Sequence, residues 1–186
     1  MNNFQKKLEE MIRVNHSGEK GAQVIYDGQI AALKLKGDIE TLKLVQHMKE
    51  QENVHFDYFD AAIKKQKIRP TLMQPIWKVG GFALGFLTAL ADKKAAMVCT
   101  TAVEETIDEH YSQQILELKK EENFLSEEEK IESMALQEKI EKFRIEEIEH
   151  RDIAYENEAA ALPFFKPLSK FIKTTTKFAI CVSKKI

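Results

Sequence analysis

The sequence contains Glu52-Asn-Val-His55 and Glu147-Ile-Glu-His150, two copies of the pattern Glu-x-x-His. On a helix, residues three positions apart lie on one face and about one turn apart. Each pair can therefore offer a carboxylate oxygen and an imidazole nitrogen to the same metal ion. Because a short pattern of this kind also arises by chance, the register of the surrounding residues decides its meaning.

Both pairs lie on the apolar face of a predicted helix. An unpaired charge is costly on such a face, so acids buried there need a partner of opposite charge. The same register places Glu146 and Glu149 on the solvent face, beside Lys139 and Lys142. The apolar side chains that share the two inner faces are Val45, Met48, Phe59 and Ala62 for the first pair, and Ile140, Phe143 and Ala154 for the second.

A metal site of this kind in a helical bundle takes one further glutamate from each of the other two helices. In the first helix the candidate is Glu19, which shares a face with Ala22 and Tyr26. In the third helix Glu104 shares its face with apolar residues, whereas the neighbours of Glu105 are polar. The register therefore selects Glu104.

The six candidate ligands form one pattern that occurs twice along the chain. A glutamate precedes Glu-x-x-His by 33 residues in the first half and by 43 residues in the second, and such a repeat indicates two similar hairpins. The alternative is a plain bundle whose acids lie at helix ends or on the solvent face. Four buried carboxylates without a cation would repel one another and take up protons. The predicted ligands are Glu19, Glu52, His55, Glu104, Glu147 and His150.

The donor set favours iron or manganese over zinc. Four carboxylates balance two divalent cations, whereas structural zinc prefers four-coordinate sites that are rich in thiolate and imidazole. We therefore expect a dinuclear carboxylate centre with two iron ions, and reactivity with dioxygen as its chemistry.

Hydrophobic periodicity predicts an all-α protein. The first expected helix begins at Val14 or Gly18 and ends near Leu35, and the second starts after Asp38, its N-cap, and continues to about Lys65. The third runs from Trp77 to about Glu121 with a break near Asp92, and the fourth runs from a capping box at Ser126-Glu-Glu-Glu129 to Ala161. A crossover at 67–76 contains two prolines, and a shorter basic helix follows Pro167. This order predicts a four-helix bundle of two hairpins with a C-terminal amphipathic helix, in a single domain spanning 1–186.

Composition excludes several other classes. The chain has 186 residues, of which only seven are Gly and four are Pro, so turn-rich β folds and low-complexity chains are not expected. Two distant cysteines, Cys99 and Cys181, do not indicate a disulfide framework. We expect no secretory leader, and no apolar run is long enough for a transmembrane helix.

The chain resembles the demethoxyubiquinone hydroxylase family of ubiquinone biosynthesis over nearly its whole length. The motifs that carry the resemblance are Met11-Ile-Arg-Val-Asn-His-Ser-Gly-Glu-Lys-Gly-Ala22, Gln51-Glu-Asn-Val-His55, Arg69-Pro-Thr71, Gly81-Phe-Ala-Leu-Gly85, Ala102-Val-Glu-Glu-Thr106, His110-Tyr111 and Phe143-Arg-Ile-Glu-Glu-Ile-Glu-His150. The resemblance implies a ferritin-like fold and the same six iron ligands. It implies dioxygen-dependent hydroxylation of a demethoxylated polyprenyl quinol, with NADH as the ultimate reductant. Tyr111 and His110 match family positions after Glu104. The two alternatives for these residues are a role beside the metal ligands and simple packing in the core.

A polyprenyl quinol resides in the bilayer, so the enzyme must reach it there. The segment 72–91 is apolar, with only Lys78 charged, and its Trp77, Phe82, Phe86 and Leu87 are expected to contact membrane or quinone. Its glycines also suit a close-packed core helix. The segment 159–186 holds six lysines and no acids, which is typical of a basic amphipathic helix on an anionic membrane surface. The alternative is a helix docked on the bundle.

The net charge of −2 divides into −8 for residues 1–158 and +6 for the last 28. The expected location is the cytoplasmic face of the bacterial inner membrane, with the mitochondrial inner membrane as the alternative. Competing functions are a ferritin-like iron-storage protein and a lipid-binding bundle without metals. Nucleic-acid binding is not expected. The sequence leaves open whether the chain forms a homo-oligomer or binds other proteins of ubiquinone biosynthesis.

Overall fold

The computed structural model describes residues 2–185, and these residues form helices and turns without a strand. The α-helices are α1 (Asn3–Lys36), α2 (Ile39–Gln66), α3 (Gln74–Ala91), α4 (Lys93–Glu121), α5 (Glu127–Glu156) and α6 (Phe165–Lys185). Short 3-10 helices η1 (Glu122–Phe124) and η2 (Ala159–Ala161) follow α4 and α5. The expected all-α fold is confirmed.

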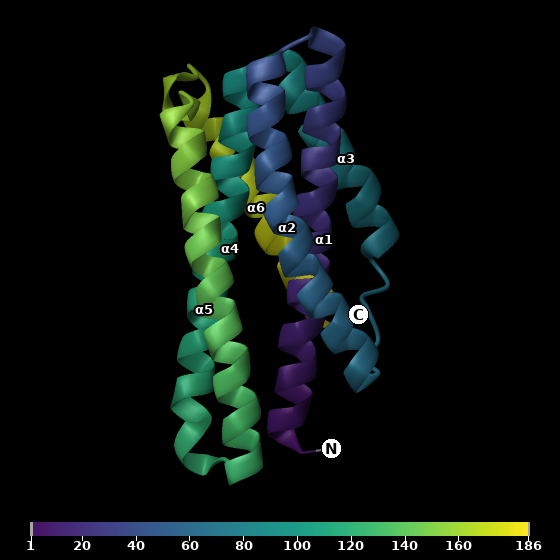
Figure 1. Ribbon diagram of the computed structural model, residues 1–186, viewed down its shortest axis with the longest axis vertical. Coiled ribbons are helices and arrows are strands. Elements are labelled where there is room, and N and C mark those ends of the chain that lie inside the picture. Colours follow the sequence, from purple (N-terminus) through teal and green to yellow (C-terminus); the bar gives the residue numbers. More distant parts are fainter. Residues whose placement is uncertain (1, 186) are drawn as a thin grey trace.

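Four long helices build the bundle as two antiparallel hairpins, α1–α2 and α4–α5 (Figure 1). The remaining two helices lie on its outside. Figure 1 shows α3 beside α1, with α6 running behind the bundle, where it packs against α4 and α1. The backbones of α1 and α4, and those of α2 and α5, lie further apart than the backbones within each hairpin, so the two hairpins meet mainly through their side chains. That arrangement leaves room for large polar groups between them.

The helix boundaries follow the capping residues. Asp38 accepts a hydrogen bond from the backbone of Thr41 and begins α2 as predicted, and Ser126 with Glu129 forms the predicted capping box of α5. Asp92 ends α3 and caps α4, which confirms the expected break. The prediction that the fourth helix continues to Ala161 was wrong, because α5 ends at Glu156.

The predicted start of the first helix was also wrong. The helix begins at Asn3, capped by the side chain of Asn2, rather than at Val14 or Gly18. Its first three turns bury Phe4 and Leu8 in the core cluster, while the polar residues between them face solvent. The polar composition of this stretch therefore reflects one exposed face of a helix.

Helices α1 and α3 touch backbone to backbone at two glycines. A Cβ atom on Gly28 would lie 2.2 Å from the carbonyl oxygen of Phe82, and one on Gly85 would lie 2.0 Å from that of Ile25. Any side chain at either position would push the helices apart. These contacts fix α3 on the outer side of α1.

Gly85→Ala is expected to lower the free energy of unfolding by about 1–3 kcal/mol, because the added methyl group collides with backbone. Chemical denaturation monitored by circular dichroism measures the change. The matched control is Gly80→Ala, since a Cβ atom at Gly80 meets nothing within 4 Å. That variant should be as stable as the wild type or slightly more stable. Equal destabilisation by both substitutions would contradict the close contact.

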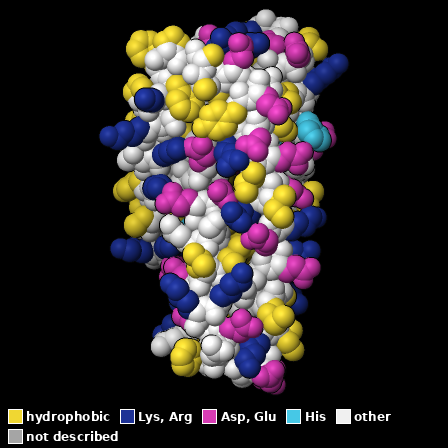
Figure 2. Space-filling view, turned by 90° about the vertical axis from the view of Figure 1, so that its left-hand side faces the viewer, with side chains coloured by type: hydrophobic (Ala, Val, Ile, Leu, Met, Phe, Trp, Pro, Cys, Tyr) yellow, Lys and Arg dark blue, Asp and Glu magenta, His cyan; other side chains and the backbone are white. Residues whose placement is uncertain are grey.

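The surface on the α5 side mixes charges of both signs. Figure 2 shows lysines and arginines interspersed with acids on this face, and hydrophobic side chains in small separate groups. Such a surface is ordinary for a face in contact with water. None of the helices described between residues 2 and 185 is long and apolar enough to cross a bilayer.

Candidate metal centre

The six predicted ligands meet in the middle of the bundle, one or two from each of its four long helices. Glu19 comes from α1, Glu52 and His55 from α2, Glu104 from α4, and Glu147 and His150 from α5. Each of these side chains is at most 1% exposed. Helical spacing thus directs every candidate toward the same buried space.

The cluster consists of two overlapping groups. Glu19, Glu52, His55 and Glu147 offer ligand atoms within 4.8 Å of one another, and so do Glu52, Glu104, Glu147 and His150. Glu52 and Glu147 belong to both groups. The geometry therefore fits two neighbouring cations, each with its own histidine and glutamate, that share two carboxylates.

Both histidines direct Nδ1 into the cluster. His55 Nδ1 lies 3.1 Å from Glu147 Oε1 and 3.6 Å from Glu19 Oε2. His150 Nδ1 lies 3.1 Å from Glu52 Oε1 and 3.5 Å from Glu147 Oε2. Each histidine thus faces the glutamates of the other hairpin as well as its own.

Two buried tyrosines hold the two unshared glutamates. Tyr26 donates a hydrogen bond of 2.7 Å to Glu104 Oε1, and Tyr111 donates one to Glu19 Oε1. Each tyrosine lies on the helix of the opposite hairpin from the glutamate that it binds. Register placed Tyr26 on the Glu19 face but gave no sign of this contact, because the contact joins two separate helices.

Burial and mutual charge interactions shift the pKa values of the glutamates and histidines in this cluster. Burial and the neighbouring Glu147 raise the pKa of Glu52 well above its usual range, and burial with the charge of Glu147 does the same for Glu104. Burial alone would lower the pKa of His55, but the carboxylates of Glu147 and Glu19 raise it to about 12. Burial opposes the charge of Glu147 too, yet the two histidines lower its pKa to about 2. The site thus draws in protons or other cations.

The residues fit a pair of metal ions. Within residues 2–185, six ligand-type atoms of the cluster are buried without a hydrogen-bond partner, a costly state that a cation would relieve. Oxygen donors with one imidazole on each side suit iron or manganese better than structural zinc. The unpartnered atoms are Glu19 Oε2, Glu52 Oε1 and Oε2, Glu104 Oε2, Glu147 Oε2 and His150 Nδ1.

Glu105 lies outside the cluster, as the register predicts. It accepts a 2.8 Å hydrogen bond from the Tyr155 hydroxyl and pairs with Lys173 of α6. A second ion pair, of 2.7 Å between Lys177 and Glu109, joins the same two helices. Glu105 therefore helps to dock α6 on α4.

The other histidines lie away from the cluster. His110 is buried, and its Nε2 lies 2.9 Å from Nε2 of Gln114. Burial and the charge of Lys184 lower the pKa of His110 to about 4. His47 is exposed. His16 lies buried in the middle of α1, and its Nε2 is 3.4 Å from Asp60 Oδ1.

The expectation that Glu146 faces solvent was wrong as well. Its side chain is half-buried, and Glu146 Oε2 lies 2.5 Å from Nε2 of His55. Gln51 makes the equivalent contact with His150, 2.9 Å from Gln51 Oε1 to Nε2. Sequence reasoning missed both partners because it considered each helix face without the helix opposite.

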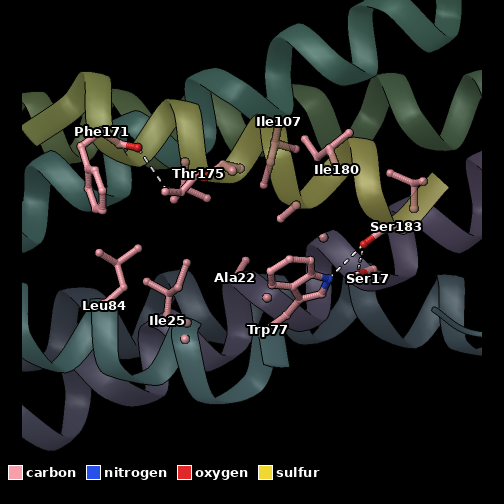
Figure 3. A pocket seen from close by; sticks show the side chains of 18 residues that line it. Ser17, Ala22, Ile25, Trp77, Leu84, Ile107, Phe171, Thr175, Ile180 and Ser183 are labelled. Atoms are coloured by element: carbon pink, nitrogen blue, oxygen red, sulfur yellow. Dashed lines mark hydrogen bonds between the residues drawn. The ribbon is translucent and has the colours of Figure 1, made fainter. Parts of the chain in front are cut away.

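An apolar cavity of about 400 Å³ lies between α1, α3, α4 and α6. Figure 3 shows Leu84 and Phe171 at one end, and at the other the Trp77 indole donating to Ser183, which also shares a hydrogen bond with Ser17. The wall toward the bundle includes Ala22, one turn from Glu19, together with Val103 and Ile107, which flank Glu104. The cavity therefore borders the helix turns that carry two of the predicted ligands.

The predicted membrane or quinone contacts lie in two different environments. Trp77 lines the cavity. Phe82 and Leu87 are exposed on α3, at 41% and 61%, while Phe86 is half-buried and stacks on Phe82. On α6, Phe171 and Phe178 are also exposed. Apolar side chains thus project from both outer helices.

Comparisons with known proteins identify close relatives. The family described as Ubiquinone biosynthesis protein COQ7 matches residues 6–183. The chain is 43% identical over 179 residues to a 3-demethoxyubiquinol 3-hydroxylase of Rhodospirillum rubrum, with 96% of this chain and 78% of the relative covered. It is 40% identical over 179 residues to proteins named NADPH-dependent 3-demethoxyubiquinone 3-hydroxylase, mitochondrial, of Dictyostelium discoideum and Homo sapiens. Those alignments cover 96% of this chain and 77% and 78% of the relatives.

Proposed function

The chain belongs to the Ubiquinone biosynthesis protein COQ7 family, and on that premise we propose that it hydroxylates a demethoxylated polyprenyl benzoquinol. Dioxygen is the oxygen source in this proposal, and the reaction is a late step of ubiquinone biosynthesis. The observation that carries it is the pair of overlapping ligand groups that share Glu52 and Glu147. Storage of iron, the alternative, has no support among the relatives' names.

In the proposed centre the six buried residues hold two iron ions. Glu19 and His55 would hold one ion and Glu104 and His150 the other, and Glu52 and Glu147, which belong to both ligand groups, would serve both ions. Bound iron would supply the activation of dioxygen for transfer of one oxygen atom to the quinol. Tyr111 and Tyr26 keep the two unshared carboxylates in place by donating hydrogen bonds to them.

The apolar cavity suits the quinol ring. Its walls are mostly apolar, and its size is within the range of small-molecule sites. A ring placed against Ala22 and Ile107 would lie beside the turns of Glu19 and Glu104. The polyprenyl tail would leave between α3 and α6, where exposed apolar side chains continue outward.

In this proposal the face formed by α3 and α6 rests on the membrane surface. Phe82 and Leu87 of α3 and Phe171 and Phe178 of α6 would enter the interface. Lysines of α6 that are not paired with α4, such as the exposed Lys166 and Lys170, would meet anionic headgroups. We expect the protein to sediment with vesicles containing an anionic lipid and to be released by salt. Binding that is equal for neutral and anionic vesicles would contradict the role of the lysines.

The electron source in the proposal is a reduced nicotinamide cofactor. The resemblance implies NADH, whereas the names of several relatives specify NADPH. The chain has no Gly-x-Gly-x-x-Gly motif of the kind that binds dinucleotides in Rossmann folds. Assays with each cofactor in parallel decide between the two.

The proposed activity is tested with iron-loaded protein, a demethoxyquinol analogue, a reduced nicotinamide cofactor and ¹⁸O-labelled dioxygen. Mass spectrometry should find a product with one added ¹⁸O atom, and chelation of the iron should abolish it. Protein without added iron is the control. Iron uptake well beyond two ions per chain, without hydroxylated product, would favour storage and overturn the proposal.

A further inference from the structure

The outer nitrogens of the two cluster histidines are held by residues of the opposite hairpin. Nε2 of His55 in α2 lies 2.5 Å from Oε2 of Glu146 in α5, and Nε2 of His150 in α5 lies 2.9 Å from Oε1 of Gln51 in α2. Each partner immediately precedes the glutamate of its own Glu-x-x-His. The two contacts are thus related by the internal repeat, but one partner is a carboxylate and the other an amide.

These two partners constrain a histidine to different degrees. An ionised carboxylate can only accept, so Glu146 requires a hydrogen on Nε2 of His55 and leaves Nδ1 free to bind a cation. A glutamine amide can accept or donate, so Gln51 accommodates His150 with either ring nitrogen protonated. A carboxylate partner also makes a ligating imidazole more basic. The half of the cluster that contains His55 is therefore better prepared to bind a cation than the half that contains His150.

Glu146 reaches this position from the edge of the bundle. Its side chain keeps 24% of its exposure, and its other oxygen lies 3.7 Å from Lys142 Nζ. Glu149, three residues further along α5, is exposed. The two acids carry the same charge on the same helix, yet only Glu146 contacts a cluster histidine within the part of the chain that the structure describes.

Resting on the di-iron centre proposed above, we propose that Glu146 and Gln51 are positioning residues that make the two halves of the centre unequal. The half that contains His55 and Glu19 binds its iron more tightly than the half that contains His150 and Glu104. The difference comes from the identity of a single side chain in each half. Exchanging the two side-chain types should therefore change the order of affinities.

The test is anaerobic titration of the full-length apo-protein with Fe²⁺ against a competing chelator, which yields two stepwise affinities without any turnover. In the wild type we expect two iron ions per chain with separable steps. Glu146→Gln should weaken the tighter step by about 10- to 100-fold and bring the two steps together. Gln51→Glu should strengthen the weaker step. Glu149→Gln, the control with the same change in charge, should leave both steps unchanged.

The outcomes separate this inference from the proposed function. Wild-type protein that binds fewer than two iron ions would count against the di-iron centre itself. If Glu146→Gln binds two ions with the same isotherm as the wild type, the positioning role alone is overturned. Equal weakening of both binding steps in Glu146→Gln would also overturn it. Mössbauer spectra of the ⁵⁷Fe-loaded proteins provide a second readout. The two iron signals should be distinct in the wild type and more alike in Glu146→Gln, and unchanged spectra would also overturn the role.

Discussion

Glu104→Ala is expected to reduce bound iron from about two ions per chain to about one or fewer, and to lower hydroxylase activity by at least about 100-fold. Glu104 is buried and is the third carboxylate, with Glu52 and Glu147, of the ligand group around His150. Alanine removes that donor and leaves the hydroxyl of Tyr26 without its acceptor. Iron analysis after gel filtration, together with a product assay, measures both effects.

Glu105→Ala is the matched control for this prediction. Glu105 is the adjacent acid of α4, but it contacts Tyr155 and Lys173 rather than the cluster. It should keep about two iron ions per chain, with only a modest change in how α6 is held. Loss of iron from Glu105→Ala with retention in Glu104→Ala would show that the assigned face of α4 is wrong.

Gly21→Phe is expected to lower kcat/KM for the quinol by at least about 100-fold while bound iron stays near two ions per chain. Gly21 lines the apolar cavity, and a Cβ atom built on it meets nothing within 4 Å. A benzyl group there would extend into the space proposed for the quinol ring, from a Cβ position that meets no other atom within 4 Å. Steady-state kinetics and iron analysis on the same preparation separate substrate access from metal binding.

Gly21→Ala serves as the control for cavity blocking. Its single methyl group fits the same open space, and alanine favours a helix over glycine by about 1 kcal/mol. This variant should retain near-wild-type kinetics and be slightly more stable. Full activity of Gly21→Phe would mean that the quinol reaches the centre by another route.

The sequence could predict that the six cluster residues are buried and meet in the bundle, because each residue lies on the apolar face of its own helix. Glu104 and Glu105 are adjacent, yet a turn of 100° per residue separates a core position from one at the α6 interface. Contacts between helices could not be predicted in this way. Three side chains contact cluster residues on another helix: Tyr26, Gln51 and Glu146. The register of one helix does not show how the neighbouring helix is oriented, so these contacts could not be predicted from it.

The placement of the two outer helices shows a similar limit. The apolar composition of 72–91 is compatible with an exposed helix that contacts membrane or quinone and with a close-packed core helix, and the sequence does not decide between them. The structure shows both features in one element, because Gly85 touches α1 while Val79 and Leu87 face outward. The early start of α1 was missed for a related reason, since polar residues on one face obscured Phe4 and Leu8 on the other.

X-ray absorption spectroscopy of the iron-loaded protein tests the central claim most directly, which is that six side chains from four helices hold two iron ions side by side. The account predicts two iron ions per chain, nearest neighbours that are mainly oxygen with some nitrogen, and an iron–iron distance of roughly 3–4 Å. A single iron per chain, or two without a short iron–iron distance, would contradict it.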